Sequence, residues 1–214
     1  KAEAEEKGEE FTKTPLIPVL GCEFYISERP EQKQFTKDDP DRRTNMVLIA
    51  KNFRGYKNLA KLSSLGFTNG YYAGVPRISK KQIVEFKEDL IAVTSGIYGD
   101  IPNAILNFGE QKGEELFLWW KEQFGEDFYV QIQNHDLPDE EHLNEVLLDL
   151  ADKHDVKILA QNETFYTKKE DSKIQDIIAC IKDGERVSTP IGKGFGKRKG
   201  LANDHYYVQN PEEL

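Results

Sequence analysis

Short apolar runs alternate with amphipathic segments along most of this chain, and that alternation constrains the fold more than any other feature. Apolar runs bounded by turn residues predict strands, and apolar residues three or four positions apart predict helices. We predict strands at residues 17–26, 46–50, 90–94, 128–132 and 156–160. We predict helices at residues 56–67, 101–108, 114–124, 138–154 and 169–182. Strands and helices in alternation predict an α/β protein with a parallel sheet or a βα barrel.

Three residues give local signals for these elements. Pro138 suits the first turn of the helix at 138–154. Gly184 suits the end of the last helix, because glycine readily adopts the left-handed conformation found there. Gly21 interrupts the first strand and predicts either a β-bulge or the close approach of another backbone segment.

Acidic residues outnumber basic ones in this chain. Its 214 residues contain 38 Asp and Glu against 29 Lys and Arg, a net charge of -9. Such a chain is a poor autonomous DNA binder, because affinity for DNA rests largely on neutralising phosphates. The local exception is the basic, glycine-rich stretch at 193–200. We interpret it as a mobile, solvated loop, with a contact to phosphate or to a partner as the alternative.

The cysteine and hydropathy patterns favour a cytoplasmic protein without membrane contact. Cys22 and Cys180 are too few for a disulfide framework, and each lies among apolar residues that predict core packing. No apolar run approaches the roughly 20 residues of a membrane helix. The highly charged opening from Lys1 is unlike a signal peptide. We expect the sequence to be a segment cut from a longer chain.

Several ordered motifs span nearly the whole chain. Residues 44–79 contain the order AKN..GYKNL..LSS.GFT.G.Y...PRI, and residues 17–25 are IPVLGCEFY. Residues 159–166 are LAQNETFY, and residues 174–181 are IQDIIACI. Together these motifs resemble the PHP (polymerase and histidinol phosphatase) domain of the α subunit of bacterial replicative DNA polymerase III.

The resemblance implies a distorted, TIM-like βα barrel of the PHP type that is incomplete at its N-terminus. On this basis residues 1–190 form a PHP domain without its first βα segment, and residues 191–214 form a connection toward the polymerase palm. The parent protein would be a DNA-directed DNA polymerase that uses magnesium at an active site outside this chain. Its partners would be the rest of the α subunit, the proofreading exonuclease subunit and other replisome subunits. DNA would be contacted only through the parent.

Five positions match those at which metal-binding PHP domains carry ligands. Glu23 matches a metal-binding Glu, and Glu163 replaces an Asp. Asn45 stands where such domains place a His, and it offers only a weak, neutral oxygen. Ile97, in the place of a Cys, and Phe165, in the place of the final His, cannot bind a metal. In these domains clustered carboxylates and imidazoles hold the cations that activate water and neutralise a phosphate.

Only Glu23 and Glu163 could therefore still bind a cation. Two carboxylates without imidazoles make a poor zinc or manganese site, because affinity depends on the number and geometry of the ligands. We predict a vestigial pocket, with no catalytic residue and no cofactor, in a structural and partner-docking domain. One alternative is an active metal-dependent 3′–5′ exonuclease or phosphoesterase site completed by the missing N-terminal segment. Another is a nucleic-acid-binding module that uses residues 193–200.

The remaining candidate side chains have structural interpretations. The four histidines show no spacing typical of metal ligands, so we predict that all lie at the surface: His135, His142, His154 and His205. Trp119 and Trp120 are neighbours in a predicted helix, and neighbours on a helix point about 100° apart. We therefore expect one of them in the core and the other partly exposed.

Overall fold

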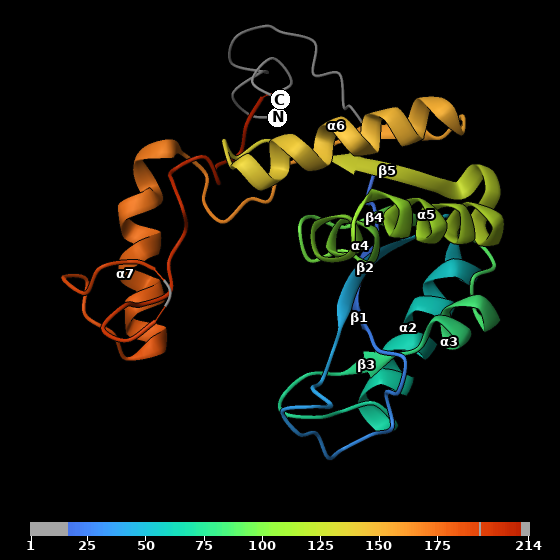
Figure 1. Cartoon of the computed structure of the whole chain (residues 1–214), viewed down its shortest axis with the longest axis horizontal. Coiled ribbons are helices and arrows are strands. Elements are labelled where there is room, and N and C mark those ends of the chain that lie inside the picture. The colour runs from blue at the N-terminus through green and yellow to red at the C-terminus, as the bar shows by residue number, and fades with distance from the viewer. Residues whose placement is uncertain (1–16, 193, 211–214) are drawn as a thin grey trace, which may run out of the picture.

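The computed structural model describes residues 17–192 and 194–210. Its six strands form one sheet in the order β3-β1-β2-β4-β5-β6. They are β1 (Gly21–Ile26), β2 (Thr44–Ala50), β3 (Arg77–Ile78), β4 (Leu90–Thr94), β5 (Phe128–Ile132) and β6 (Lys157–Ala160). β3 and β6 lie at opposite edges, so the sheet is open in the described residues (Figure 1). An α/β fold with an open sheet agrees with the predicted incomplete βα barrel.

The strand directions are mixed. β2 runs antiparallel to both β1 and β4, whereas the β1–β3, β4–β5 and β5–β6 pairs are parallel. The purely parallel sheet offered as one possibility by the strand–helix alternation is therefore wrong. The reason is local, because residues 27–43 join β1 to β2 without a helix and a loop allows an antiparallel return.

Helices follow most of the strands, as predicted. They are α2 (Phe53–Thr68), α3 (Lys80–Glu85), α4 (Asp100–Phe108), α5 (Glu110–Phe124), α6 (Pro138–Lys153) and α7 (Ser172–Asp183). Single 3₁₀ turns precede β5 (η1, Gly125–Asp127) and α7 (η2, Lys169–Asp171). The short helix α3 was not predicted, and a capping box between Ser79 and Gln82 begins it. Gly184 ends α7 with φ of 70°, as expected. None of the described helices has both the length and the apolar composition to cross a membrane.

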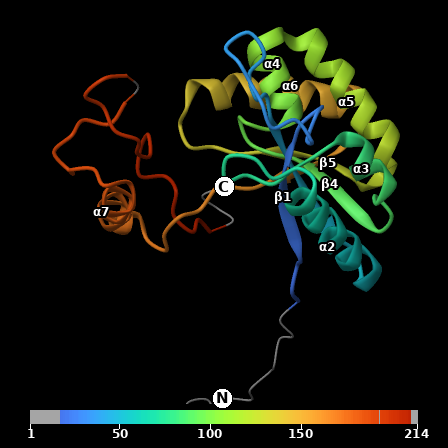
Figure 2. The same ribbon diagram turned by 90° about the horizontal axis from the view of Figure 1, so that it is seen from below.

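The core lies on one face of the sheet. Phe24, Met46, Leu48, Ala92 and Val130 alternate onto this face and form a single cluster with buried residues of α2 to α6. These helices cover that side of the sheet in Figures 1 and 2. Each fully buried aliphatic or aromatic side chain contributes about 1.5–3 kcal/mol, so this layer accounts for most of the stability of the fold.

The tryptophans and cysteines lie as the sequence predicted. Trp120 is fully buried, whereas Trp119 is partly exposed and packs against the core. Cys22 also packs against the core, Cys180 is buried, and both are free thiols. Gly21 pairs in regular register with β2, so it forms no bulge. A Cβ at Gly21 would lie 3.1 Å from the Leu48 carbonyl oxygen, which supports the prediction of a close backbone approach.

The loop between β1 and β2 is held by a buried arginine. Arg77 of β3 is 0 % exposed and ion-pairs with Asp41 at 2.7 Å. The same guanidinium donates to the carbonyl oxygens of Pro30, Gln32 and Gly70 at 2.8–3.0 Å. Four bonds from one side chain therefore fix the loop and the turn after α2 in place.

Helix α7 and the loop around Arg198 stand apart from the helices that cover the sheet (Figures 1 and 2). There Arg198 is buried and forms a bidentate ion pair with Asp176 of α7 at 2.6 and 2.8 Å. The interpretation of residues 193–200 as a mobile, solvated loop is therefore wrong for Arg198, because its charge is satisfied within the chain. Residue 193 lies outside the described residues.

Candidate functional site

Two of the five predicted ligand positions are in direct contact at the β1–β2 pair. Glu23 lies in the middle of β1, on the sheet face opposite the core, and is exposed. Asn45 of β2 donates a hydrogen bond from its side-chain amide to Glu23 Oε1 over 2.9 Å. The Asn45 backbone N–H donates to the carbonyl oxygen of Tyr98 at 2.9 Å, which ties β2 to the loop after β4. The carboxylate of Glu23 is thus bonded to an amide where metal-binding relatives would supply an imidazole.

Glu163 lies in the loop after β6, which is the strand at the opposite edge of the sheet from β3. The two carboxylates are near enough that their negative charges interact. Desolvation, and then the charge of Glu163, raises the pKa of Glu23 above its ordinary value. Desolvation likewise raises the pKa of Glu163, although the positive charge of His135 acts in the opposite direction. The fold therefore places the charge of Glu163 where it acts on Glu23.

The other two positions cannot contribute ligands. Ile97, in the loop between β4 and α4, packs against the hydrophobic core. Phe165 is 45 % exposed, and its ring lies 5.8 Å from that of Tyr206. Within residues 17–192 and 194–210 no group of three or more His, Cys, Asp and Glu side chains could hold a metal ion. The residues present do not fit a zinc or manganese centre, which needs more ligands than two carboxylates.

An unpredicted polar centre lies beside this pocket, where β5 leads into α6. His135 is 0 % exposed and Glu140 is 4 % exposed. His135 Nδ1 lies 2.8 Å from Glu140 Oε1, and the His135 backbone N–H donates to Glu140 Oε2 at 2.7 Å. Gln133 Nε2 also donates to Glu140 Oε1, at 2.8 Å. The prediction that all four histidines lie at the surface is therefore wrong for His135.

Both ring nitrogens of His135 face oxygen acceptors. Nδ1 faces the Glu140 carboxylate, and Nε2 lies 3.1 Å from the backbone carbonyl oxygen of Glu163. Burial lowers the pKa of His135, but these bonds and charges outweigh it and raise that pKa overall. Burial raises the pKa of Glu140, and the bonds from His135 and Gln133 outweigh it and lower that pKa. Both pKa shifts favour an imidazolium–carboxylate ion pair at this buried position.

The C-terminal segment closes over His135. The ring of Tyr206 stacks on the imidazole with centroids 4.2 Å apart, and Asn203 donates to the His135 carbonyl oxygen. Burial raises the pKa of Tyr206 to about 12, so its hydroxyl stays protonated. The Phe165 N–H donates to the Tyr206 carbonyl oxygen at 2.9 Å. His135 therefore joins β5, α6, the loop after β6 and residues 203–206.

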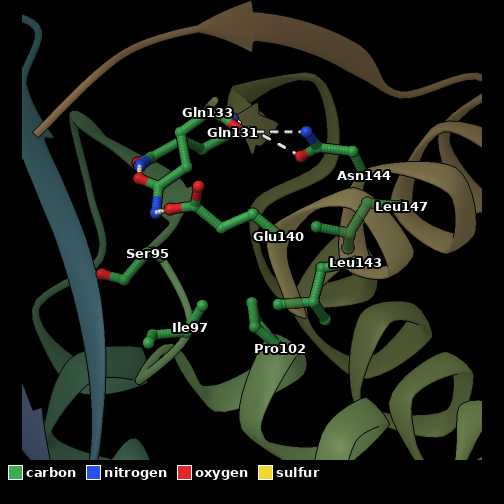
Figure 3. Close-up of a pocket in the computed structure, with 10 residues that line it drawn as sticks. Ser95, Ile97, Pro102, Gln131, Gln133, Glu140, Leu143, Asn144 and Leu147 are labelled. Carbon is green, nitrogen blue, oxygen red and sulfur yellow. Dashed lines mark hydrogen bonds between the residues drawn. The ribbon is translucent and has the colours of Figure 1, made fainter. Parts of the chain in front are cut away.

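A small cavity adjoins this centre (Figure 3). Its volume is about 10 Å³, room for about one water molecule. It is lined by side chains from β5, α6 and the loop after β4, including Ser95, Gln131, Gln133 and Glu140. Ser95 Oγ and Gln131 Oε1 are buried without a hydrogen-bond partner among the described residues. The cavity is far too small for a nucleotide.

One sequence signal could have located the buried pair. Polar residues at the end of a buried strand often form a site, because strand ends meet at one edge of a sheet. The polar run from Gln133 to Asp136 follows β5 in this way. Glu140 lies in the first turns of α6 and could equally have been a helix-dipole residue. Only the fold shows that it turns inward toward His135.

Comparison with known proteins identifies the family of this chain. The sequence model of the PHP domain family matches residues 2–135. The chain is 33% identical over 205 residues to DNA polymerase III subunit alpha of Borreliella burgdorferi, covering 96% of this chain and 17% of that protein. It is 30% identical over 211 residues to the protein of the same name from Campylobacter jejuni, covering 93% of this chain and 17% of that protein.

A third relative shows the same extent of similarity. DNA polymerase III subunit alpha of Thermus aquaticus is 30% identical over 198 residues, covering 92% of this chain and 16% of that protein. The chain thus spans about a sixth of the length of the curated relatives it matches. This chain belongs to the PHP domain family, and its relatives are DNA polymerase III α subunits.

Proposed function

We propose that this chain is a structural and partner-docking PHP segment of a bacterial replicative DNA polymerase α subunit and has no catalytic metal centre of its own. One observation carries the proposal: among the described residues no three possible ligands come together, since Asn45 bonds Glu23 and Ile97 packs into the core. Cations that activate water for phosphoester cleavage need a more complete ligand set.

The whole polypeptide would be a DNA-directed DNA polymerase. Its polymerase site would use magnesium held by residues outside this chain, and DNA would be contacted there. The partners would be the rest of the α subunit, the proofreading exonuclease subunit and other replisome subunits, all in the cytoplasm. The sequence similarity to proteins named DNA polymerase III subunit alpha supports this role.

The proposal is tested by metal analysis of the full-length parent protein. Elemental analysis after gel filtration should find no stoichiometric zinc or manganese, and added manganese should produce no chelator-sensitive 3′–5′ exonuclease activity. The matched control is the Glu23→Gln, Glu163→Gln double variant. Stoichiometric metal or manganese-dependent exonuclease activity that this variant loses would refute the proposal.

The second candidate function is an active metal-dependent exonuclease or phosphoesterase. The observation that favours it is the pair of desolvated carboxylates, because burial raises the pKa of both Glu23 and Glu163 and the charge of Glu163 adds to the shift of Glu23. A third possibility, nucleic-acid binding through residues 193–200, is weakened by the ion pair between Arg198 and Asp176. Salt-dependent binding of single-stranded DNA, lost on charge reversal of Lys197 and Lys199, would favour that possibility.

A further inference from the structure

The outer side of α2 carries an unusual concentration of exposed aromatic rings. Phe53, Tyr56 and Phe67 of the helix are 69%, 46% and 58% exposed, and Tyr71 in the following turn is 48% exposed. The spacing of these residues places them on one side of a 3.6-residue helix. The opposite side packs on the sheet through Gly55, Leu59, Leu62 and Gly66. We refer to Phe53, Tyr56, Phe67 and Tyr71 as the α2 aromatic face.

The four rings form two stacked pairs at opposite ends of the helix. The rings of Phe53 and Tyr56 lie 6.1 Å apart, and those of Phe67 and Tyr71 lie 5.8 Å apart. Between the pairs the exposed residues include the small Ala60 and Ser64. The 11 positions from Tyr56 to Phe67 span about 16 Å of helix, and a helix with its side chains is about 10 Å wide. A polypeptide segment therefore has room to lie between the two pairs.

The end of this surface is rigidly supported. Lys33 Nζ donates to the carbonyl oxygens of Asn69 and Tyr71, each at 2.8 Å. Arg77 bonds the carbonyl oxygen of Gly70 at 3.0 Å. A turn held in this way loses little conformational entropy on binding, which favours a preorganised docking surface.

The charges on α2 are partly neutralised within the chain. Arg54 is paired with Asp89 and also lies 3.6 Å from Glu88. In contrast, Lys57 and Lys61 form no ion pair with any described carboxylate. Lys57 lies 4.7 Å from the ring of Phe53, and Lys61 lies 5.2 Å from that of Phe86. Two lysines without acidic partners thus flank aromatic rings on a protein whose net charge is -9.

We propose that the α2 aromatic face, with Lys57 and Lys61, docks an acidic polypeptide segment that carries apolar anchor residues. This inference rests on the partner-docking half of the proposed function and identifies its surface. Exposed aromatic rings that gather on one surface are typical of protein interfaces. Charge complementarity selects an acidic segment. Two unpaired cations are too few to hold nucleic acid, whose binding releases counterions from many phosphates.

The first test is a selection of random 16-residue peptides displayed on phage, with the full 214-residue chain as target. We expect enrichment of peptides that combine Asp or Glu with Phe, Leu or Trp. Their affinity should fall at least about tenfold for the Phe53→Ser, Phe67→Ser variant. The matched control is Phe108→Ser, an equally exposed aromatic at the end of α4. Failure to enrich peptides, or equal binding by both variants, would overturn the proposal.

The second test separates charge from apolar contact by fluorescence anisotropy with a selected peptide. Lys57→Glu with Lys61→Glu should weaken binding and reduce its dependence on salt. Lys112→Glu with Lys153→Glu makes the same charge change on α5 and α6 and should leave binding unchanged. Tighter binding of a single-stranded oligothymidylate than of the peptide would show that the surface serves nucleic acid and would overturn the proposal.

A third variant separates this inference from the absence of a metal centre. Glu23→Gln with Glu163→Gln should bind the selected peptide as the unaltered chain does. Glu23 lies on the face of the sheet opposite α2, and Glu163 lies in the loop after β6. Loss of binding in this variant would overturn the assignment to α2. The metal content of the parent would stand as a separate result in either case.

Discussion

Replacement of the buried Arg77 by methionine should destabilise the fold strongly. The guanidinium donates to Asp41, Gly70, Pro30 and Gln32, and none of its surface is exposed. Methionine preserves the length and much of the volume of the side chain. It removes the charge and all four hydrogen bonds, so Asp41 is left in a mostly buried position without its main partner.

The magnitude follows from the cost of separating a buried ion pair. Removal of one partner typically costs about 3–5 kcal/mol, because the remaining charge stays desolvated. For a chain of this size that corresponds to a decrease in Tm of about 6–20 °C. Arg77 also lies 5.3 Å from the ring of Phe35 and 5.2 Å from that of Tyr72. Methionine should keep apolar contact with both rings, which limits any contribution from a cavity.

The assay is urea unfolding monitored by the fluorescence of Trp119 and Trp120. The free energy of unfolding is extrapolated linearly to water. The matched control is Arg43→Met, because Arg43 faces the same Asp41 at 3.9 Å but is partly exposed. Exposed pairs of this kind contribute at most about 1 kcal/mol. A cost for Arg77→Met no greater than that for Arg43→Met would refute the argument that this buried pair holds the loop.

Three further predictions concern the site and α2. Glu23→Gln and Glu163→Gln should each raise Tm at about pH 7.5 and change it little at about pH 4. A carboxyl group whose pKa is raised by folding stabilises the protein fully at pH values below its ordinary pKa. That stabilisation is lost as pH rises through the pKa of the folded state. A lower Tm at pH 7.5 for both variants would contradict this. For His135→Gln, the loss of unfolding free energy should be larger at about pH 6 than at about pH 9. The raised pKa of His135 makes its contribution complete below about pH 6.5, and it is lost as pH rises through the folded pKa. An equal loss at both pH values would argue against the ion pair with Glu140. Gly55→Ala should destabilise the fold by about 1–3 kcal/mol in urea unfolding, because its Cβ would lie 2.2 Å from a backbone oxygen of the loop before β4. A cost within about 0.5 kcal/mol would show that the loop moves freely.

The two carboxylates of the pocket could be found in the sequence because their surroundings are ordered motifs. Glu23 lies in a strand with a recognisable sequence, and Glu163 follows another. What the sequence could not supply was their environment. The bond from Asn45 to Glu23 joins residues 22 positions apart, and the pairing of strands creates it.

His135 shows the limit of sequence-based prediction more clearly. Its neighbours in sequence are polar, and its spacing from other histidines carries no signal. Its burial results from Glu140 on α6, the backbone of Glu163 and the ring of Tyr206, which lies 71 positions away. Contacts of such long range depend on how the elements pack, and no local pattern encodes them.

The sequence by itself determined most of the strands and helices and the net negative charge. These properties depend on side-chain chemistry and on periodicity within a few residues. The tertiary structure alone decided that β2 runs antiparallel to its neighbours and that Arg77 and His135 are buried. Each of these features requires distant segments to be held against one another, and the free energy of packing, rather than local preference, selects them.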